Sequence, residues 1–170
     1  MKTLKIISLI LMLAFSISLV KANPPANNID KITKAYLGLK NALVAGNGTL
    51  AQAKGKELLD ALSTDATKGL NPDQQKLLNS YLDKLKFDSR HISEVPNIEH
   101  QREHFESLSK NMYDVLKGLK VNTSTLYQQY CPMKKAYWLS ESADIKNPYY
   151  GGSEMATCGK TTATLKGTEL

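Results

Sequence analysis

The amino-acid sequence predicts a mainly α-helical fold, an antiparallel four-helix bundle with an irregular, partly β C-terminal segment packed on it. Three observations lead to this prediction. Apolar residues recur at steps of three and four along four stretches between residues 29 and 119, which is the spacing of one helix face. Short polar connections separate the stretches, and this favours antiparallel neighbours. From about Val121 onward the chain becomes rich in Tyr, Thr, Gly and turn residues and has no such stripe.

A glycine-rich turn separates the first two predicted helices. The first helix carries its apolar face on Ile29, Ile32, Tyr36, Leu39 and Leu43. Residues 46–48, Gly-Asn-Gly, are expected to end it. Thr49 is expected to cap the second helix, whose inward side chains are Leu58, Leu59 and Leu62. Gly38 and Gly55 each weaken a helix, so we expect close helix–helix approach at these two positions.

Two further helices begin at N-terminal signals. Asn71, Pro72 and Asp73 fit an N-cap, a first-position proline and a first-turn acid. Asn97 is expected to cap the fourth helix, after a polar loop that contains His91. The expected inward residues are Leu78, Tyr81, Leu82 and Leu85 in the third helix, and Ile98, Phe105, Leu108, Met112, Leu116 and Leu119 in the fourth. Residues 126–130 alternate in a way that is typical of a short strand.

The N-terminal residues predict export. Two lysines precede an apolar run from Ile6 to Val20, and Ala22 ends a sequence suited to signal-peptidase cleavage. This run of about 15 residues falls short of the roughly 20 that span a bilayer. We therefore expect a signal peptide over residues 1–22, a single mature domain over residues 23–170 and a periplasmic location without membrane insertion.

Charge and motifs argue against two classes of function. Removal of residues 1–22 lowers the formal charge from +6 to +3, because it removes three lysines and no acid. Basic residues are not clustered or interleaved with aromatics, so a nucleic-acid partner is not expected. The chain has no P-loop, dinucleotide fingerprint or zinc-protease motif, and no nucleophile elbow. An enzyme is therefore not expected.

Both cysteines lie in the C-terminal segment, residues 121–170, and each has a methionine nearby. The two elements are Cys131-Pro132-Met133 and Met155-Ala156-Thr157-Cys158. Thiolate and thioether are soft donors that suit copper as Cu(I), whereas a disulfide needs no thioether. If the two elements meet, Cys131, Met133, Met155 and Cys158 supply up to four sulfur ligands. A structural disulfide between the cysteines is the alternative, since exported proteins commonly contain one.

Histidine adds a fifth candidate ligand. His100 and His104 lie one turn apart on the predicted fourth helix and so share a face. His104 falls at the edge of the apolar stripe, where it points from the helix surface towards whatever covers it. It therefore joins the four sulfur residues as a candidate metal ligand. His100 is expected to be more solvated, and His91 has less support.

The C-terminal motifs resemble those of a known family. They are Tyr130-Cys131-Pro132-Met133, Ala136-Tyr137-Trp138-Leu139-Ser140, Ile145-Lys146-Asn147-Pro148-Tyr149-Tyr150-Gly151, and Met155 with Cys158-Gly159, and the similarity extends upstream to residues 101–109. The chain resembles uncharacterised bacterial periplasmic domains of unknown function, which occur alone or fused to periplasmic adaptor subunits of heavy-metal efflux pumps.

This resemblance implies a helical periplasmic domain that handles copper or a related metal, with an efflux pump or adaptor as partner. Motif matching carries over Cys131, Met133, Met155 and Cys158, and also His104. Cys-Pro-Met further resembles the metal-binding element of small heavy-metal-binding modules, which carry a histidine beside the motif where this chain has tyrosine and lysine. We therefore expect a protein that buffers Cu(I) or delivers it to an efflux or insertion partner. The alternative is a disulfide-stapled periplasmic interaction module without metal.

Overall fold

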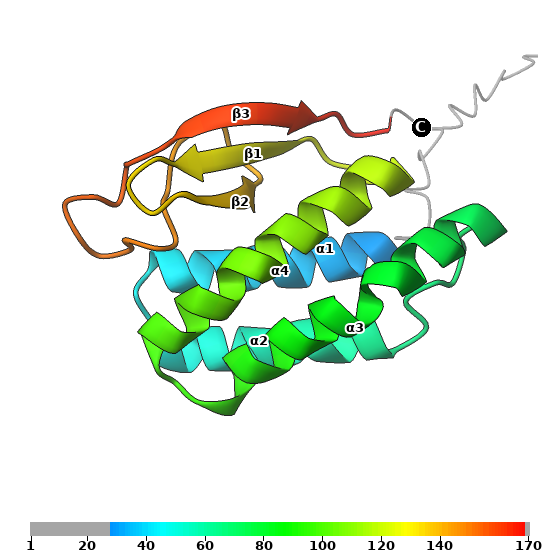
Figure 1. The fold of residues 1–170 in the computed structure, drawn as a ribbon, viewed down its shortest axis with the longest axis horizontal. Coiled ribbons are helices and arrows are strands. Elements are labelled where there is room, and N and C mark those ends of the chain that lie inside the picture. The colour runs from blue at the N-terminus through cyan, green and yellow to red at the C-terminus, as the bar shows by residue number, and fades with distance from the viewer. Residues whose placement is uncertain (1–27, 169–170) are drawn as a thin grey trace, which may run out of the picture.

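Four helices and a small antiparallel sheet form the fold of residues 28–168, the part of the chain that the computed structural model describes (Figure 1). The helices are α1 (Asn28–Val44), α2 (Gly48–Ser63), α3 (Pro72–Glu94) and α4 (Ile98–Leu119). The strands are β1 (Leu126–Cys131), β2 (Ala136–Ser140) and β3 (Lys160–Leu165). The predicted signal peptide lies outside the described residues. Within residues 28–168, none of the helices combines the length and apolar character needed to cross a bilayer.

The helices follow one another closely along the chain. Each consecutive pair is in contact, and each helix runs back along the one before it (Figure 1). The sheet lies over α1 and α4, while α2 and α3 lie on the other side of these two helices (Figure 1). The fold is therefore mainly helical, as predicted, and the C-terminal segment does pack on the helices.

The predicted inward face of α1 is buried. Its five apolar residues are Ile29, Ile32, Tyr36, Leu39 and Leu43, none of which is more than 2% exposed. The Tyr36 ring stacks on Phe105 of α4 with centroids 5.3 Å apart. Its hydroxyl lies 2.7 Å from Ser109 Oγ and accepts a hydrogen bond from the Leu139 N–H at 3.1 Å. Tyr36 thus connects both helices that support the sheet to the outer edge of β2.

Side-chain caps start three of the helices. Asn71 and Gln74 form a capping box at α3, and Asn97 accepts hydrogen bonds from two first-turn N–H groups of α4, so both predicted caps are confirmed. The prediction that Thr49 caps α2 is wrong. The cap is Asn47, whose side chain accepts from the Leu50 N–H at 2.9 Å. Asparagine is the stronger cap, and the helix already begins at Gly48.

The end of α3 differs from the prediction. His91 was expected in a polar loop, but α3 continues to Glu94 because Ile92 is fully buried and extends its apolar face. A Cβ on Gly55 of α2 would lie only 2.8 Å from Ile92 Cγ2, so the expected close helix approach is confirmed there. Gly38 instead meets only the flexible side chain of Lys54, at an ordinary 3.4 Å.

The sheet has the order β2-β1-β3, and both pairings are antiparallel. The short strand expected near residues 126–130 is confirmed as β1, the central strand. Strands β2 and β3 were not predicted individually. Cys131 at the end of β1 pairs with Ala136 at the start of β2 across a tight turn, in which Lys135 has a φ of 58°. This turn places the first cysteine at one end of the sheet.

An ion pair joins α1 to the residue after β2. Lys40 is buried, and its Nζ lies 2.8 Å from Glu141 Oε2, while Asn41 donates to Glu141 Oε1 at 3.0 Å. Partial burial raises the pKa of the Glu141 carboxyl, but the hydrogen bonds from Lys40 and Asn41 outweigh this effect and hold the pKa below its usual value. The ionised carboxylate is therefore the form that the fold stabilises.

We expect Glu141→Gln to lower the free energy of unfolding by about 2 kcal/mol at neutral pH, because it leaves the buried Lys40 ammonium without a counter-charge. This is less than for a fully buried pair, since the Glu141 side chain is 44% exposed. Because the pKa of Glu141 is lower in the folded than in the unfolded state, its carboxylate stabilises the fold at pH values above the unfolded-state pKa. This stabilisation is lost as the pH falls through the folded-state pKa. The difference from wild type in urea unfolding should therefore shrink in acid.

The matched control is Glu57→Gln. Glu57 forms a surface ion pair with Lys54 at 2.8 Å, and such pairs contribute about 0–1 kcal/mol. If both variants lose the same stability, the Lys40 pair has no special structural role.

Candidate functional site

The two cysteines lie side by side at the end of the sheet. Cys131 ends β1, and Cys158 lies in the loop just before β3. Their Sγ atoms are 3.1 Å apart, and both cysteines are free thiols. We call these two residues the sulfur pair. Two segments that are 27 residues apart in sequence thus bring two soft donors together at one point.

The turn after Cys131 creates a favourable environment for a thiolate. Cys131 is fully buried. Burial raises its pKa, but hydrogen bonds from the Cys158 thiol and from the backbone N–H groups of Lys134 and Met133 outweigh it, so the Cys131 pKa is lowered. The pKa of Cys158 is raised because this thiol donates to Cys131. Cys131 is therefore the member of the pair that ionises first.

Asn147 holds the loop that carries Cys158. Its backbone N–H donates to the Ala156 carbonyl at 2.7 Å, and its Nδ2 donates to the Cys158 carbonyl, also at 2.7 Å. Its Oδ1 accepts from the Tyr149 N–H at 2.9 Å, and its side chain also hydrogen-bonds Cys131. Asn147 is fully buried. Sequence reasoning did not assign it a role, although it belongs to the Asn-Pro-Tyr-Tyr-Gly motif.

Arg102 of α4 anchors the same loop to the helices. Its Nε donates to the Pro148 carbonyl at 2.9 Å, and its Nη2 donates to the Gly151 carbonyl at 3.2 Å and to the Leu43 carbonyl at 3.5 Å. Glu99 pairs with its Nη1 at 2.9 Å. One buried guanidinium thus joins the end of α1, the start of α4 and the loop before Cys158.

Gly159 and Trp138 pack beside the sulfur pair. A Cβ on Gly159 would lie 2.9 Å from Trp138 Cη2 and 3.2 Å from the Tyr130 carbonyl oxygen. Only a residue without a Cβ fits at this position without a shift of its neighbours. Trp138, the single tryptophan of the chain, is fully buried. It is a natural spectroscopic reporter for changes at Cys158.

The two methionines lie in the turns that carry the sulfur pair. Met133 is 67% exposed, and its backbone N–H donates to the Cys131 sulfur. Met155 is half-buried, and its carbonyl accepts from the Cys158 N–H at 2.9 Å. Methionine side chains are long and flexible. Both methionines therefore stay candidate donors, placed in the turns next to the two cysteines.

His104 lies among residues of the helices. Its Nδ1 donates to Asp88 Oδ1 of α3 at 3.1 Å, and its ring centroid lies 4.6 Å from that of His91 and 4.8 Å from that of His100. These partners belong to α3 and α4, not to the C-terminal segment. The His91–His104 contact was missed because His91 was expected in a loop. His100, expected to be solvated, is half-buried.

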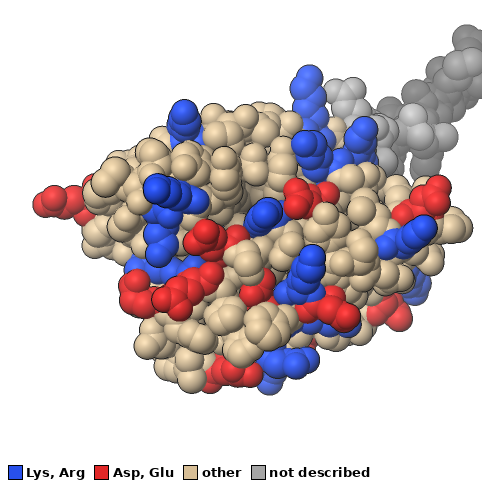
Figure 2. All heavy atoms as spheres, in the orientation of Figure 1, with Lys and Arg blue, Asp and Glu red and all other residues tan. Residues whose placement is uncertain are grey.

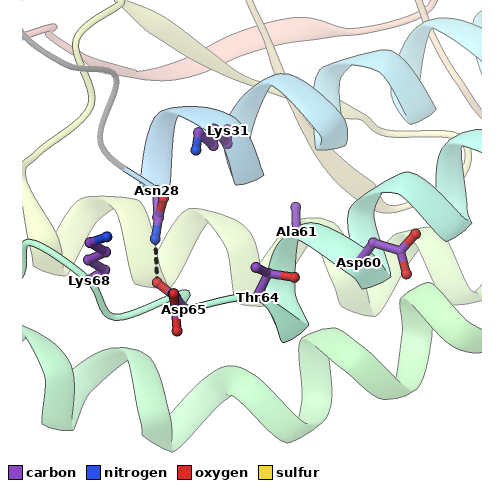
Figure 3. A pocket seen from close by; sticks show the side chains of 7 residues that line it. All are labelled: Asn28, Lys31, Asp60, Ala61, Thr64, Asp65 and Lys68. Atoms are coloured by element: carbon purple, nitrogen blue, oxygen red, sulfur yellow. Dashed lines mark hydrogen bonds between the residues drawn. The ribbon is translucent and has the colours of Figure 1, made fainter.

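The remaining surface offers less specific chemistry. On the face in Figure 2, basic and acidic side chains are interspersed without a continuous basic patch. A pocket of about 290 Å³ lies where the start of α1 meets the end of α2 (Figure 3). It is lined by Asn28, Lys31, Asp60, Ala61, Thr64, Asp65 and Lys68. Its two lysines and two aspartates balance in charge, and it contains no soft donor.

No curated protein and no solved structure matches the chain. A family match covers residues 32–124, which extend from the second turn of α1 past the end of α4 and stop just before β1. The sulfur pair and the C-terminal motifs therefore lie beyond the matched residues. Because the match spans more than half of the 170 residues, the chain belongs to the family described as "Protein of unknown function (DUF3347)".

Proposed function

We propose that this protein is a periplasmic copper-binding protein that holds Cu(I) at the sulfur pair. The observation that carries the proposal is the 3.1 Å approach of two free thiols, one of them buried with a lowered pKa. Thiolates and thioethers are the protein donors that select Cu(I). The apolar run at the N-terminus supports export, and the resemblance of the C-terminal motifs to metal-handling periplasmic domains supports a copper cargo.

Each residue has a distinct part in the proposed site. Cys131 supplies a thiolate that backbone N–H groups already stabilise, and Cys158 releases its proton when the ion binds. Met155 and Met133 add thioethers from the flanking turns. Asn147 and Arg102 hold the Cys158 loop in place. The exposed Met133 side chain lies where a partner can compete for the ion, which suits a protein that buffers Cu(I) or delivers it to an efflux or insertion partner.

A disulfide-stapled interaction module is the second candidate, and the same short sulfur–sulfur distance favours it. Exported proteins meet oxidising conditions, and closing the loop from Cys131 to Cys158 would contribute roughly 3–4 kcal/mol in the chain-entropy model. A thiol count on the protein as isolated separates the two candidates, because two blocked cysteines that resist mild reduction favour the staple.

The test of the copper proposal is a titration of the reduced chain, residues 23–170, with Cu(I) against a chromophoric chelator. We expect one tightly bound ion per chain, with a change in Trp138 fluorescence that reaches its endpoint at the same stoichiometry. Failure to compete with even a weak chelator would refute the proposal and favour the stapled module.

A further inference from the structure

We infer that His91, His100 and His104 form a second metal site, which takes a borderline divalent ion such as Zn²⁺ or Cu²⁺. One ring nitrogen from each histidine lies within 4.8 Å of the other two, and all three residues are half-buried. The chain contains three histidines, so the structure gathers all of them in this one place. Imidazole is the donor that suits Zn²⁺ and Cu²⁺, in contrast to the softer sulfur pair.

The backbone brings the three histidines together in a defined way. His91 lies in the last turn of α3, and His100 and His104 lie one turn apart on one face of α4. The connection between the helices spans only residues 95–97. Gln101 fixes this corner, because its buried amide donates to the Val95 carbonyl at 2.9 Å and to the Ile92 carbonyl at 3.3 Å. The histidine positions are therefore set before any ion arrives.

Carboxylates lie beside two of the three rings, with Asp88 hydrogen-bonded to His104 and Glu94 close to His91. The His104 Nδ1 donates to Asp88, a residue that is only 4% exposed and whose other carboxylate oxygen accepts from Ser107. The His91 Nδ1 lies 3.4 Å from Glu94 Oε2. Each of these contacts leaves Nε2 as the nitrogen that is free to bind an ion. This arrangement of carboxylate, histidine and metal is the usual outer-shell pattern of protein metal sites.

Binding of one ion requires the rings to rotate, because the His91 and His104 rings are stacked with their planes 6° apart. Nitrogens bound tetrahedrally at 2.0–2.1 Å lie about 3.3 Å apart, compared with at most 4.8 Å here. Phe87 packs on the His91 ring with centroids 4.4 Å apart and shields one side of the cluster. Three protein nitrogens leave a fourth position for water or an exchangeable ligand, which is typical of zinc sites that are not purely structural.

The test uses untagged chain, residues 23–170, in which Cys131→Ser and Cys158→Ser remove the sulfur ligands. This choice makes the result independent of the copper proposal. We expect one Zn²⁺ per chain in a chelator competition, and shifts of all three histidine ring signals in NMR spectra at the same stoichiometry. Zn²⁺ at a hundredfold excess over its Kd should raise the Tm by roughly 5–10 °C, because the ion binds the folded chain and not the unfolded one.

Variants assign the site to these residues. His100→Gln and His104→Gln should each weaken Zn²⁺ binding at least about 100-fold, whereas Lys110→Ala, an exposed position on the same helix, should not change it. Asp88→Asn should weaken binding roughly 10- to 100-fold with all three imidazoles present. Glu94→Gln tests whether the carboxylate beside His91 also strengthens Zn²⁺ binding. Glu94 is exposed, so this substitution should leave the fold intact. Absence of uptake of both Zn²⁺ and Cu²⁺, or uptake that the histidine variants leave unchanged, would overturn the inference.

Discussion

Replacing Cys131 with serine is expected to weaken Cu(I) binding by about 100- to 1,000-fold. Structural four-ligand zinc sites have a total binding free energy of about 10–16 kcal/mol, which corresponds to roughly 2.5–4 kcal/mol per ligand. Cys131 should be the most sensitive position, because it is the buried thiol whose pKa is lowered by neighbouring N–H donors. The measurement is competition for Cu(I) against a chelator of known affinity.

Control variants separate ligand loss from misfolding. Met155→Leu and Met133→Leu remove a thioether while nearly preserving side-chain volume, so each reports on one sulfur donor without leaving a cavity. Cys158→Ser should also weaken Cu(I) binding if both thiols bind the ion, but by less than Cys131→Ser. Far-UV circular dichroism should stay at the wild-type level in all four variants. Unchanged Cu(I) affinity in both cysteine variants would contradict the proposed site.

The helices were largely predictable because burial follows the helical period. The face of α1 that carries Tyr36 and Leu39 is buried as the pattern indicates, and the Asn71 cap is a local signal that needs no tertiary information. The end of α3 was missed for an identifiable reason. Ser89 and Ile92 continue the buried face beyond Leu85 at steps of four and three residues, but the surrounding polar residues obscured this short extension.

The sheet was less predictable than the helices. Strand β3 is largely exposed and consists mostly of threonine, alanine and leucine, so its position depends on pairing with β1 rather than on its own pattern. The position of strand β2 depends partly on α1, because the Leu139 N–H of β2 donates a hydrogen bond to the Tyr36 hydroxyl of α1. Such contacts join residues about a hundred positions apart, and local periodicity does not contain them.

In the candidate sites too, features of the local sequence were predictable, whereas contacts between distant residues were not. Soft donors near both cysteines pointed to one cluster, and the structure places the two thiols together. The roles of Asn147 and Arg102 were not predictable, because both residues bind backbone carbonyls of a loop whose path is set only in the folded protein. The spacing of His100 and His104 was visible in the sequence, whereas His91 joins them only through the packing of α3 on α4.

Replacing Gly151 with alanine is expected to lower the free energy of unfolding by about 3 kcal/mol, at the upper end of overpacking effects. A Cβ at this position would lie 2.3 Å from the carbonyl oxygens of both Leu43 and Val44. These are backbone atoms at the end of α1, so they cannot move aside as a flexible side chain would. Gly152→Ala is the matched control, since its Cβ meets no atom within 4 Å and only its φ of +78° opposes the change. It should cost about 1 kcal/mol.

The same substitution tests whether the helices position the sulfur pair. Gly151 and Pro148 present the carbonyls that Arg102 binds, and the loop continues from there to Cys158. A loop displaced from α1 would lose these hydrogen bonds and move Cys158 away from Cys131. Gly151→Ala should therefore weaken Cu(I) binding as well as stability, whereas Gly152→Ala should leave the affinity near that of wild type. Equal effects of the two variants in urea unfolding and in Cu(I) competition would show that the contact with α1 does not hold the loop.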